Sequence, residues 1–375
     1  MADVAVVGAG LIGAGIAYEL AKRGATVVVY DRDEPARAAS WAGAGMLAPF
    51  SEVIEHAAMR ALCTASFGAY PAFVEELRER TGVDARFRRD GTLHVALDAP
   101  ALESLRARAA GCAEAGGDVH VLDRPAALSR EAALARSVTG ALFVANEAQV
   151  DNRRLGRALV AACIALEVRF ERTAEVAVQC DARRVRGLRT QHGFVPATTV
   201  VNAAGAWAGA LDGVPAGAQV PVVPVAGEMV ALAVPHALMR ALIWHGHTYL
   251  VPRADGRVLI GATVVERGFD ARVTAGGVRT LLDTALQAVP ALSRFALVET
   301  WAGLRPATPD RLPVIGATNL EGYFVAGGHF RNGILLAPVT ARAVAELIAT
   351  GTTDVATAAF APSRFLPGAM RAAAN

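Results

Sequence analysis

The sequence predicts an α/β protein with two domains, one holding a Rossmann-like parallel sheet and the other an antiparallel β-sheet. Three observations lead to this prediction. Glycine-rich turns follow apolar strands near both ends of the chain, at Gly8 and Gly328, and a third such turn lies at Gly205. The stretches between these turns show the short, evenly spaced apolar runs that are typical of antiparallel strands. The parallel layer is therefore expected to be discontinuous in the sequence.

The composition is that of a globular chain with enough apolar residues for a sizeable core. Of the 375 residues, 53% are apolar and 19% are charged. The formal net charge of +2 argues against a nucleic-acid partner. The four cysteines lack Cys-x-x-Cys spacing, so neither disulfides nor a metal site is expected. No signal-peptide pattern precedes the first strand and no uncharged apolar run reaches the ~18 residues that span a bilayer, so a cytoplasmic location is expected.

The first strand, turn and helix form a dinucleotide-binding pattern. An apolar run at Val4–Val7 precedes the turn, and helical spacing over Leu11–Lys22 follows it. The glycines of the turn are Gly8, Gly10 and Gly13. They permit, in order, the tight turn, the approach of a pyrophosphate and the close packing of helix on strand, while the helix N-terminus faces the phosphates. Asp31 ends the next strand, where a carboxylate can accept ribose hydroxyls. The pattern fits NAD and FAD alike.

The following elements are expected from their apolar spacing. A loop rich in small residues at 41–49 is expected to lie against a cofactor. Helices are expected at 51–81, 101–115, 152–166 and 274–289. Strands are expected at 87–97, 141–144, 198–201, 221–234, 244–252, 258–265, 298–304 and 313–316. Short antiparallel strands are expected at 168–170, 176–178, 185–189 and 194–196.

The C-terminal region repeats the opening arrangement of strand, glycine turn and helix. A strand from Tyr323 runs into a double glycine, and a helix follows to about residue 349. A plain NAD domain has no need of this return, whereas a flavin domain uses the positive end of such a helix at the pyrimidine side of the ring. FAD is therefore favoured. The predicted FAD-binding domain comprises residues 1–85, 148–218 and 303–375, and the substrate-binding domain comprises residues 86–147 and 219–302.

Over nearly its whole length, the chain resembles the D-amino-acid oxidase superfamily and, within it, the glycine oxidases, which are flavoenzymes of thiamine biosynthesis. The resemblance is carried by the Gly8–Gly13 turn and by the motifs at 40–47, 245–253, 301–306 and 328–338. It implies a flavoprotein with an FAD-binding domain and a β-sheet substrate domain. None of the four cysteines lies in these motifs, so the FAD is expected to be non-covalent.

The resemblance also implies roles for individual residues at the cofactor. Leu11 and Ile12 would lie over the pyrophosphate, Asp31 and Arg32 near the adenosine ribose, and the backbone of Val176 at the adenine. The family usually carries Glu where Asp31 stands. The other residues expected at the cofactor are Ala39, Ser40, Ala44, Gly45, Met46 and Gly205. Those expected around the flavin ring are His329, Phe330, Arg331, Asn332, Gly333, Ile334 and Leu335.

The expected catalytic residues are Arg305, Tyr249 and Arg331. An arginine fork pairs bidentately with a carboxylate, so Arg305 is expected to hold that of the substrate, although it could instead cap backbone carbonyls. Arg331 is expected to help at the same site or to contact the flavin, and Tyr249 to close over the substrate or to lie in the core. Val264 stands where glycine oxidases can carry Met, which leaves the preferred amine open.

Two histidines, His245 and His247, would share one face of a strand, a spacing that can bind metal. No third ligand is evident in the sequence, so a metal is not expected.

The implied reaction is oxidative deamination of glycine or a small D-amino acid. Hydride would pass from the α-carbon to flavin N5, and the resulting imine would hydrolyse to a 2-oxo acid and ammonia. Oxygen or another acceptor would then take the electrons. The alternatives are a dehydrogenase that acts on D-amino acids or sarcosine with a non-oxygen acceptor, and a non-catalytic FAD-binding protein. A homo-oligomer is also compatible with the resemblance.

Overall fold

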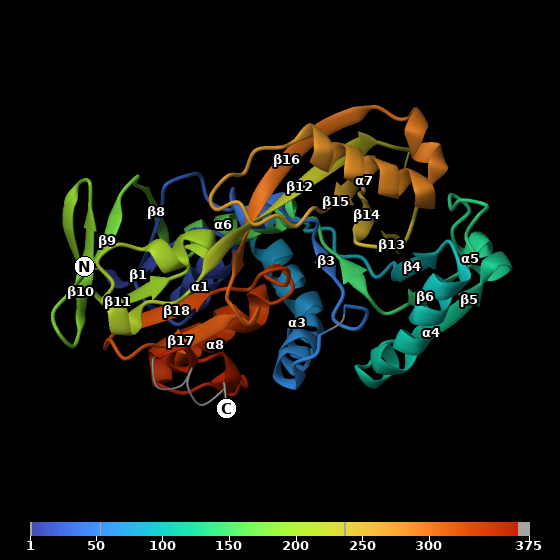
Figure 1. The fold of residues 1–375 in the computed structure, drawn as a ribbon. Helices are drawn as coiled ribbons and strands as arrows, with labels where there is room; N and C mark the ends of the chain where they lie inside the picture. Colours follow the sequence, from blue (N-terminus) through green and yellow to red (C-terminus); the bar gives the residue numbers. More distant parts are fainter. Residues whose placement is uncertain (1, 53, 236–237, 367–375) are drawn as a thin grey trace.

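The computed structural model describes residues 2–52, 54–235 and 238–366, and Figure 1 shows its fold. Within these ranges the strands form two eight-stranded sheets and a two-stranded ribbon. Four parts of the predicted domain segments, namely residue 1, residue 53, residues 236–237 and residues 367–375, lie outside the described residues. The predicted combination of a parallel and an antiparallel sheet is confirmed.

The first sheet is the parallel layer, with the order β17-β18-β11-β1-β2-β8. Its strands are β1 (Ala2–Val7), β2 (Val27–Asp31), β8 (Arg169–Arg172), β11 (Gly193–Asn202), β17 (Val314–Ala317) and β18 (Tyr323–Gly327). β1 pairs in parallel with β2 and β11, and β11 pairs in parallel with β18. The antiparallel strands β9 (Val176–Cys180) and β10 (Val185–Thr190) extend β11. Segments far apart in the sequence therefore share one sheet.

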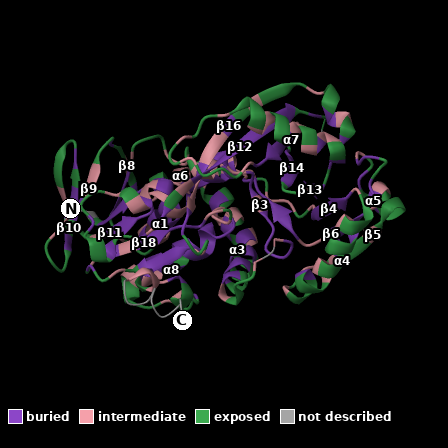
Figure 2. Ribbon diagram, viewed as in Figure 1, coloured by how far each residue is buried: buried purple, intermediate pink, exposed green. Residues whose placement is uncertain are grey.

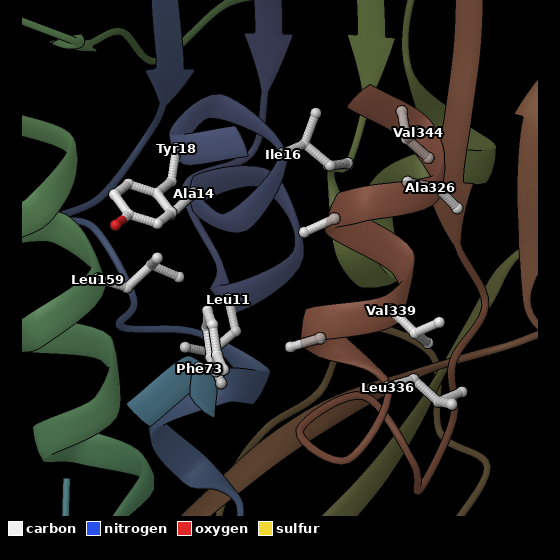
Figure 3. Packing of buried hydrophobic residues seen from close by; sticks show 14 of the residues in the cluster. Leu11, Ala14, Ile16, Tyr18, Phe73, Leu159, Ala326, Leu336, Val339 and Val344 are labelled. Atoms are coloured by element: carbon white, nitrogen blue, oxygen red, sulfur yellow. The ribbon is translucent and has the colours of Figure 1, made fainter. Parts of the chain in front are cut away.

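Two helices, α1 (Leu11–Lys22) and α8 (Ala337–Thr350), pack on strands of the parallel sheet. A second layer of helices, α3 (Ala57–Thr81) and α6 (Asn152–Ala165), packs against them. Figure 3 shows α1 between α6 and α8, with Tyr18 directed toward Leu159 and with Val339 and Val344 on α8. Because α1 is buried against helices on both sides, it lies at the centre of the first core.

The second sheet is mostly antiparallel, with the order β16-β12-β15-β14-β13-β4-β6-β5. Its strands are β4 (Thr92–Ala96), β5 (Val119–Asp123), β6 (Gly140–Val144), β12 (Val223–Ala233), β13 (Leu242–His245), β14 (Thr248–Pro252), β15 (Arg257–Gly261) and β16 (Leu297–Ala307). Its helices are α4 (Ala99–Glu114), α5 (Arg124–Arg130) and α7 (Ala275–Ala288). In Figure 2, buried residues fill most strands of both sheets, while α5 and the strands β5 and β8 are largely exposed.

The remaining elements connect the two sheets. The short helix α2 (Ala39–Ala42) precedes β3 (Met46–Leu47), which pairs with β7 (Ala148–Gln149). Short 3₁₀ helices lie at Gly205–Ala210, Ala216–Ala218, Pro290–Arg294, Ala358–Phe360 and Pro362–Phe365. β16 crosses the predicted domain boundary at residue 303, and the division into domains stays a prediction.

Four expected strands differ in the structure. β8 pairs in parallel with β2 rather than joining the antiparallel strands, because helix α6 makes a crossover between them. Residues 194–196 and 198–201 form the single strand β11, and Pro196 falls where this strand pairs with β10. The expected strand at 244–252 is a tight hairpin, because Gly246 takes a φ of +56° and turns the chain between β13 and β14.

Candidate active site

One deep cavity lies between the two sheets. It is lined by residues at the carboxyl ends of four strands of the parallel sheet, β1, β2, β11 and β18. Its other wall comes from β12, β14 and β16 of the second sheet. The carboxyl edge of an open parallel sheet is where such folds bind ligands, so the cavity is the candidate active site.

The glycine turn after β1 is held in a fixed shape at the start of this cavity. Gly8 has a φ of +103°, and a Cβ at this position would overlap the carbonyl oxygen of Ala203. Asp31 accepts a hydrogen bond from the Ala9 backbone at 2.6 Å, and the Ser40 hydroxyl accepts one from the Leu11 backbone at 2.9 Å. The turn therefore has the compact form that lets a pyrophosphate approach the helix N-terminus.

Most of the predicted cofactor residues line this cavity. They are Gly8, Gly10, Ile12, Asp31, Arg32, Ala39, Ser40, Ala44, Gly45, Met46, Val176, Gly205, His329, Phe330, Arg331, Asn332, Gly333 and Ile334. The other three, Leu11, Gly13 and Leu335, are not part of the lining. The side chains of Leu11 and Leu335 are packed in the core, and Gly13 lies so close to Gly8 that a Cβ would overlap its carbonyl. The individual roles of all these residues stay predictions.

A buried arginine from the second sheet holds the small-residue loop against the cavity. Arg253 is only 5% exposed. Its Nη2 donates to the Ala44 carbonyl at 2.9 Å and to Asn152 Oδ1 at 2.7 Å, and its Nη1 donates to the Val150 carbonyl at 2.5 Å. Burial lowers the pKa of Arg253 to about 10, which leaves the guanidinium charged at neutral pH. Arg253 therefore links the loop to the second sheet.

Arg305 reaches the cavity from β16. Its Nη1 donates to the Thr263 carbonyl at 3.0 Å and to the Ala226 carbonyl at 3.3 Å. The side chain passes directly over Gly227, where a Cβ would overlap the guanidinium. Burial lowers its pKa, but an arginine stays charged at neutral pH. The carbonyl-capping alternative thus describes the Nη1 side of the fork, while the guanidinium also faces Tyr249 in the cavity.

Tyr249 and Arg331 meet Arg305 at this end of the cavity, which we call the arginine end. Tyr249, on β14, is 7% exposed and donates to Met229 Sδ at 3.4 Å. Burial raises its pKa, so its hydroxyl stays protonated at neutral pH. The guanidinium of Arg331 lies 5.4 Å from the ring centre of Trp244. The structure therefore brings the three predicted catalytic residues together.

Three further residues line the cavity that sequence reasoning missed. Glu52 lies at the arginine end, 3.9 Å from Arg331. Met229 lies beside Tyr249, and Trp207 stacks under the guanidinium of Arg32 at 4.1 Å. Trp207 follows Gly205 closely and could have been found from that turn. Glu52 gives no signal in the sequence, because its place depends on contacts with distant segments.

Two histidines of the predicted motifs contact other side chains, and none belongs to a cluster of metal ligands among the described residues. His245 contacts Gln287 at 3.2 Å, and the turn at Gly246 separates it from His247, so the expectation that both share one strand face is wrong. His329 contacts Thr340 at 3.1 Å, and burial lowers its pKa to about 3, which leaves it neutral. Among the described residues, no group of three His, Cys, Asp or Glu side chains could hold a metal ion.

Within the residues that the structure describes, no helix is long and apolar enough to cross a membrane.

A buried carboxylate behind the arginine end predicts a pH-dependent stability. Burial raises the pKa of Glu147 from 4.5 to about 7. Because the folded pKa exceeds the unfolded value, the associated stability is fully present below pH 4.5 and is lost as the pH rises through 7. We expect the wild type to lose about 3 kcal/mol more than E147Q in the free energy of unfolding over this range. Urea titrations of both proteins across the range check this, and parallel pH curves would contradict it.

Residues 3–347 match the model of the DAO family, which is described as FAD dependent oxidoreductase. The chain belongs to this family. The family match confirms the predicted FAD cofactor and the predicted oxidoreductase class. It also confirms the resemblance that the motifs suggested.

Two relatives and one solved structure show how far the similarity extends. The glycine oxidase of Geobacillus kaustophilus is 37% identical over 368 residues, which are 97% of this chain and 97% of that protein. The bifunctional protein ThiO/ThiG of Trichormus variabilis is 36% identical over 97% of this chain but 55% of its own length, so our chain spans about half of that relative. A crystal structure of glycine oxidase from Geobacillus kaustophilus superposes with a TM-score of 0.92 at 37% identity, covering 97% of this chain and 99% of that one. The predicted two-domain FAD-binding architecture is confirmed.

The cavity of this FAD dependent oxidoreductase fits the cofactor. Gly8, Gly10 and Ile12 line the cavity at the N-terminus of α1, and Gly205 has open space where a Cβ would stand. Arg32 and Asp31 lie at the end of β2, and residues 329–334 lie at the opposite wall. A dinucleotide held by these residues would extend from the glycine turn toward the arginine end.

Proposed function

We propose that this protein oxidises glycine or another small amino acid, with its carboxylate bound by Arg305. The observation that carries the proposal is a largely buried arginine fork in the same cavity as the dinucleotide turn. Tyr249 and Arg331 support it, because they add a hydroxyl and a second positive charge at the same end. The glycine oxidases among the relatives support the choice of substrate.

The residues of the arginine end would bind and orient the amino acid. The free side of the Arg305 fork pairs with the carboxylate, which directs the α-carbon toward the flavin wall at His329 and Phe330. Tyr249 closes one side, and its buried position keeps bulk water away. Bound FAD supplies the acceptor for the hydride that leaves the α-carbon, so the protein needs no strong base. Water then hydrolyses the released imine to a 2-oxo acid and ammonia.

The similarity also bears on the acceptor and on the pathway. We propose oxygen as the electron acceptor, because the similar protein of Geobacillus kaustophilus is a glycine oxidase. A role in thiamine biosynthesis is proposed on the resemblance to the thiamine-type glycine oxidases. A dehydrogenase that uses another acceptor is the alternative outcome of the test below.

The purified yellow protein provides the test. Glycine added without oxygen is expected to bleach the flavin absorbance, and air is expected to restore it with release of ammonia and glyoxylate. If D-alanine, D-proline or sarcosine bleaches the flavin and glycine does not, the reaction is the proposed oxidation but the preferred substrate is that other amine. Colour that returns with a quinone but not with air would establish the dehydrogenase. Flavin that none of these amines reduces would contradict the proposed function.

A further inference from the structure

The arginine end carries a negative charge that the proposed reaction does not use. Glu52 lines the cavity, its side chain is 19% exposed, and its Oε1 lies 3.9 Å from Arg331 Nη2. Burial raises the pKa of the Glu52 carboxyl, whereas the charges of Arg331 and Arg305 lower it and favour the ionised form, and the Glu52 charge acts on Tyr249. Two cations and one anion therefore share the place where the substrate carboxylate is expected.

The chain segment that carries Glu52 is held in place by a buried carboxyl group and a half-buried arginine. Glu147, which is fully buried, accepts hydrogen bonds from the Phe50 and Ser51 backbone at 3.0 and 2.7 Å and from the Ser51 hydroxyl at 2.8 Å. Arg108, from helix α4, donates to the Ser51 carbonyl at 2.6 Å. These bonds hold both the N–H and the carbonyl of the residue before Glu52. Glu52 is thus directed into the cavity by the fold rather than by a loose loop.

The charge balance of the arginine end suits an amino acid with one carboxylate. Arg305 would be neutralised by that carboxylate, and Arg331 already faces Glu52. A second carboxylate on the substrate would approach Glu52 in a partly desolvated site, where like charges repel strongly. A neutral group of the same shape would meet no such repulsion.

We propose that Glu52 is a specificity-determining residue that excludes amines with a second carboxylate. It does so by pairing with Arg331 and by placing its own negative charge in the cavity. This inference rests on the proposed function, because it names the substrates that the same site admits and rejects. It predicts that the substrate's charge, and not its size, decides the rejection.

The holoenzyme and two variants test this through turnover of matched amines. Iminodiacetate and its monoamide have the same shape but differ by one charge. We expect the wild type to favour the monoamide by at least about tenfold in kcat/KM, and E52Q to narrow this ratio by about tenfold. E55Q is the control, because Glu55 is exposed and is not part of the cavity lining, yet the change removes the same charge. A ratio in E52Q within about twofold of the wild-type ratio would overturn the proposal.

An equilibrium measurement separates this proposal from the proposed function. Malonate and malonamate differ in the same way as the amines, and their binding perturbs flavin absorbance without turnover. The wild type is expected to bind malonamate more tightly, and E52Q is expected to lose the preference. Equal affinities in the wild type would overturn the proposal even if E52Q failed to fold. If the protein oxidises no amine but still prefers malonamate to malonate, and E52Q lacks this preference, the selection by charge is supported. The proposed amino-acid oxidase activity is then refuted.

Discussion

Replacing Arg305 with methionine is expected to lower kcat/KM for the amino-acid substrate by about a thousandfold. The variant keeps much of the side chain's length but removes a buried cation that pairs with the carboxylate through charge-assisted bonds. Loss of one partner of such a buried pair costs about 3–5 kcal/mol, which corresponds to this factor. The carboxylate also orients the α-carbon, so kcat should fall together with the affinity. Anaerobic reduction of the flavin at increasing substrate concentration measures both effects.

A second arginine provides the control for this experiment. Arg294 is exposed on the surface of the second sheet's layer, and R294M should leave both kinetic parameters within about twofold of the wild type. R305K retains the charge without the fork and should recover only part of the activity. R305M protein that retains its FAD but loses less than about tenfold in kcat/KM would show that Arg305 caps carbonyls and does not bind substrate.

Replacing Gly8 with alanine is expected to abolish FAD binding. The added Cβ would overlap the Ala203 carbonyl, and the φ of +103° disfavours any L-residue. The strain amounts to about 3 kcal/mol or more, and relief requires the turn or the end of β11 to move. Either movement shifts the turn and the N-terminus of α1, which the pyrophosphate is expected to approach. The FAD content of the purified variant and FAD titration of the apoprotein measure the loss.

Gly24→Ala is the matched control, since Gly24 also has a positive φ of +85° but has nothing within 4 Å of the point where an added methyl group would stand. This change should cost about 1 kcal/mol of stability and leave the FAD content unchanged. G8A protein that is purified with a full complement of FAD would contradict the assignment of the turn to the cofactor.

The sequence predicts those parts of the fold that need particular residue types at a fixed local spacing. The turn at Gly8 needs glycines at fixed spacing, and the buried strands β1 and β18 need apolar runs, so both are visible without any alignment. The hairpin at Gly246 is not predicted, because a single glycine within an apolar run does not reveal a turn. The parallel pairing of β8 is not predicted either, because pairing depends on the crossover and not on the strand's own residues.

The same distinction holds for the site. Arg305 and Tyr249 can be predicted because each stands in a motif that resembles a known family. Glu52 cannot, since its position depends on Glu147 and Arg108, which are 95 and 56 residues away in the sequence. Arg253 stands out in the sequence only as the end of a motif, and its bonds to Ala44 and Asn152 show that it holds the small-residue loop in place.

The order of strands in the parallel sheet has a consequence for how the protein is made. β1 leaves the ribosome before its partner β11, which begins at residue 193, and β11 in turn pairs with β18, which begins at residue 323. An apolar strand with an unpaired edge is prone to associate with other chains. During translation, all of the residues between β1 and β18 must emerge before this layer closes. Nascent chains of this protein are therefore expected to depend on chaperones that shield β1, and truncation before β18 should yield aggregates rather than a smaller folded enzyme.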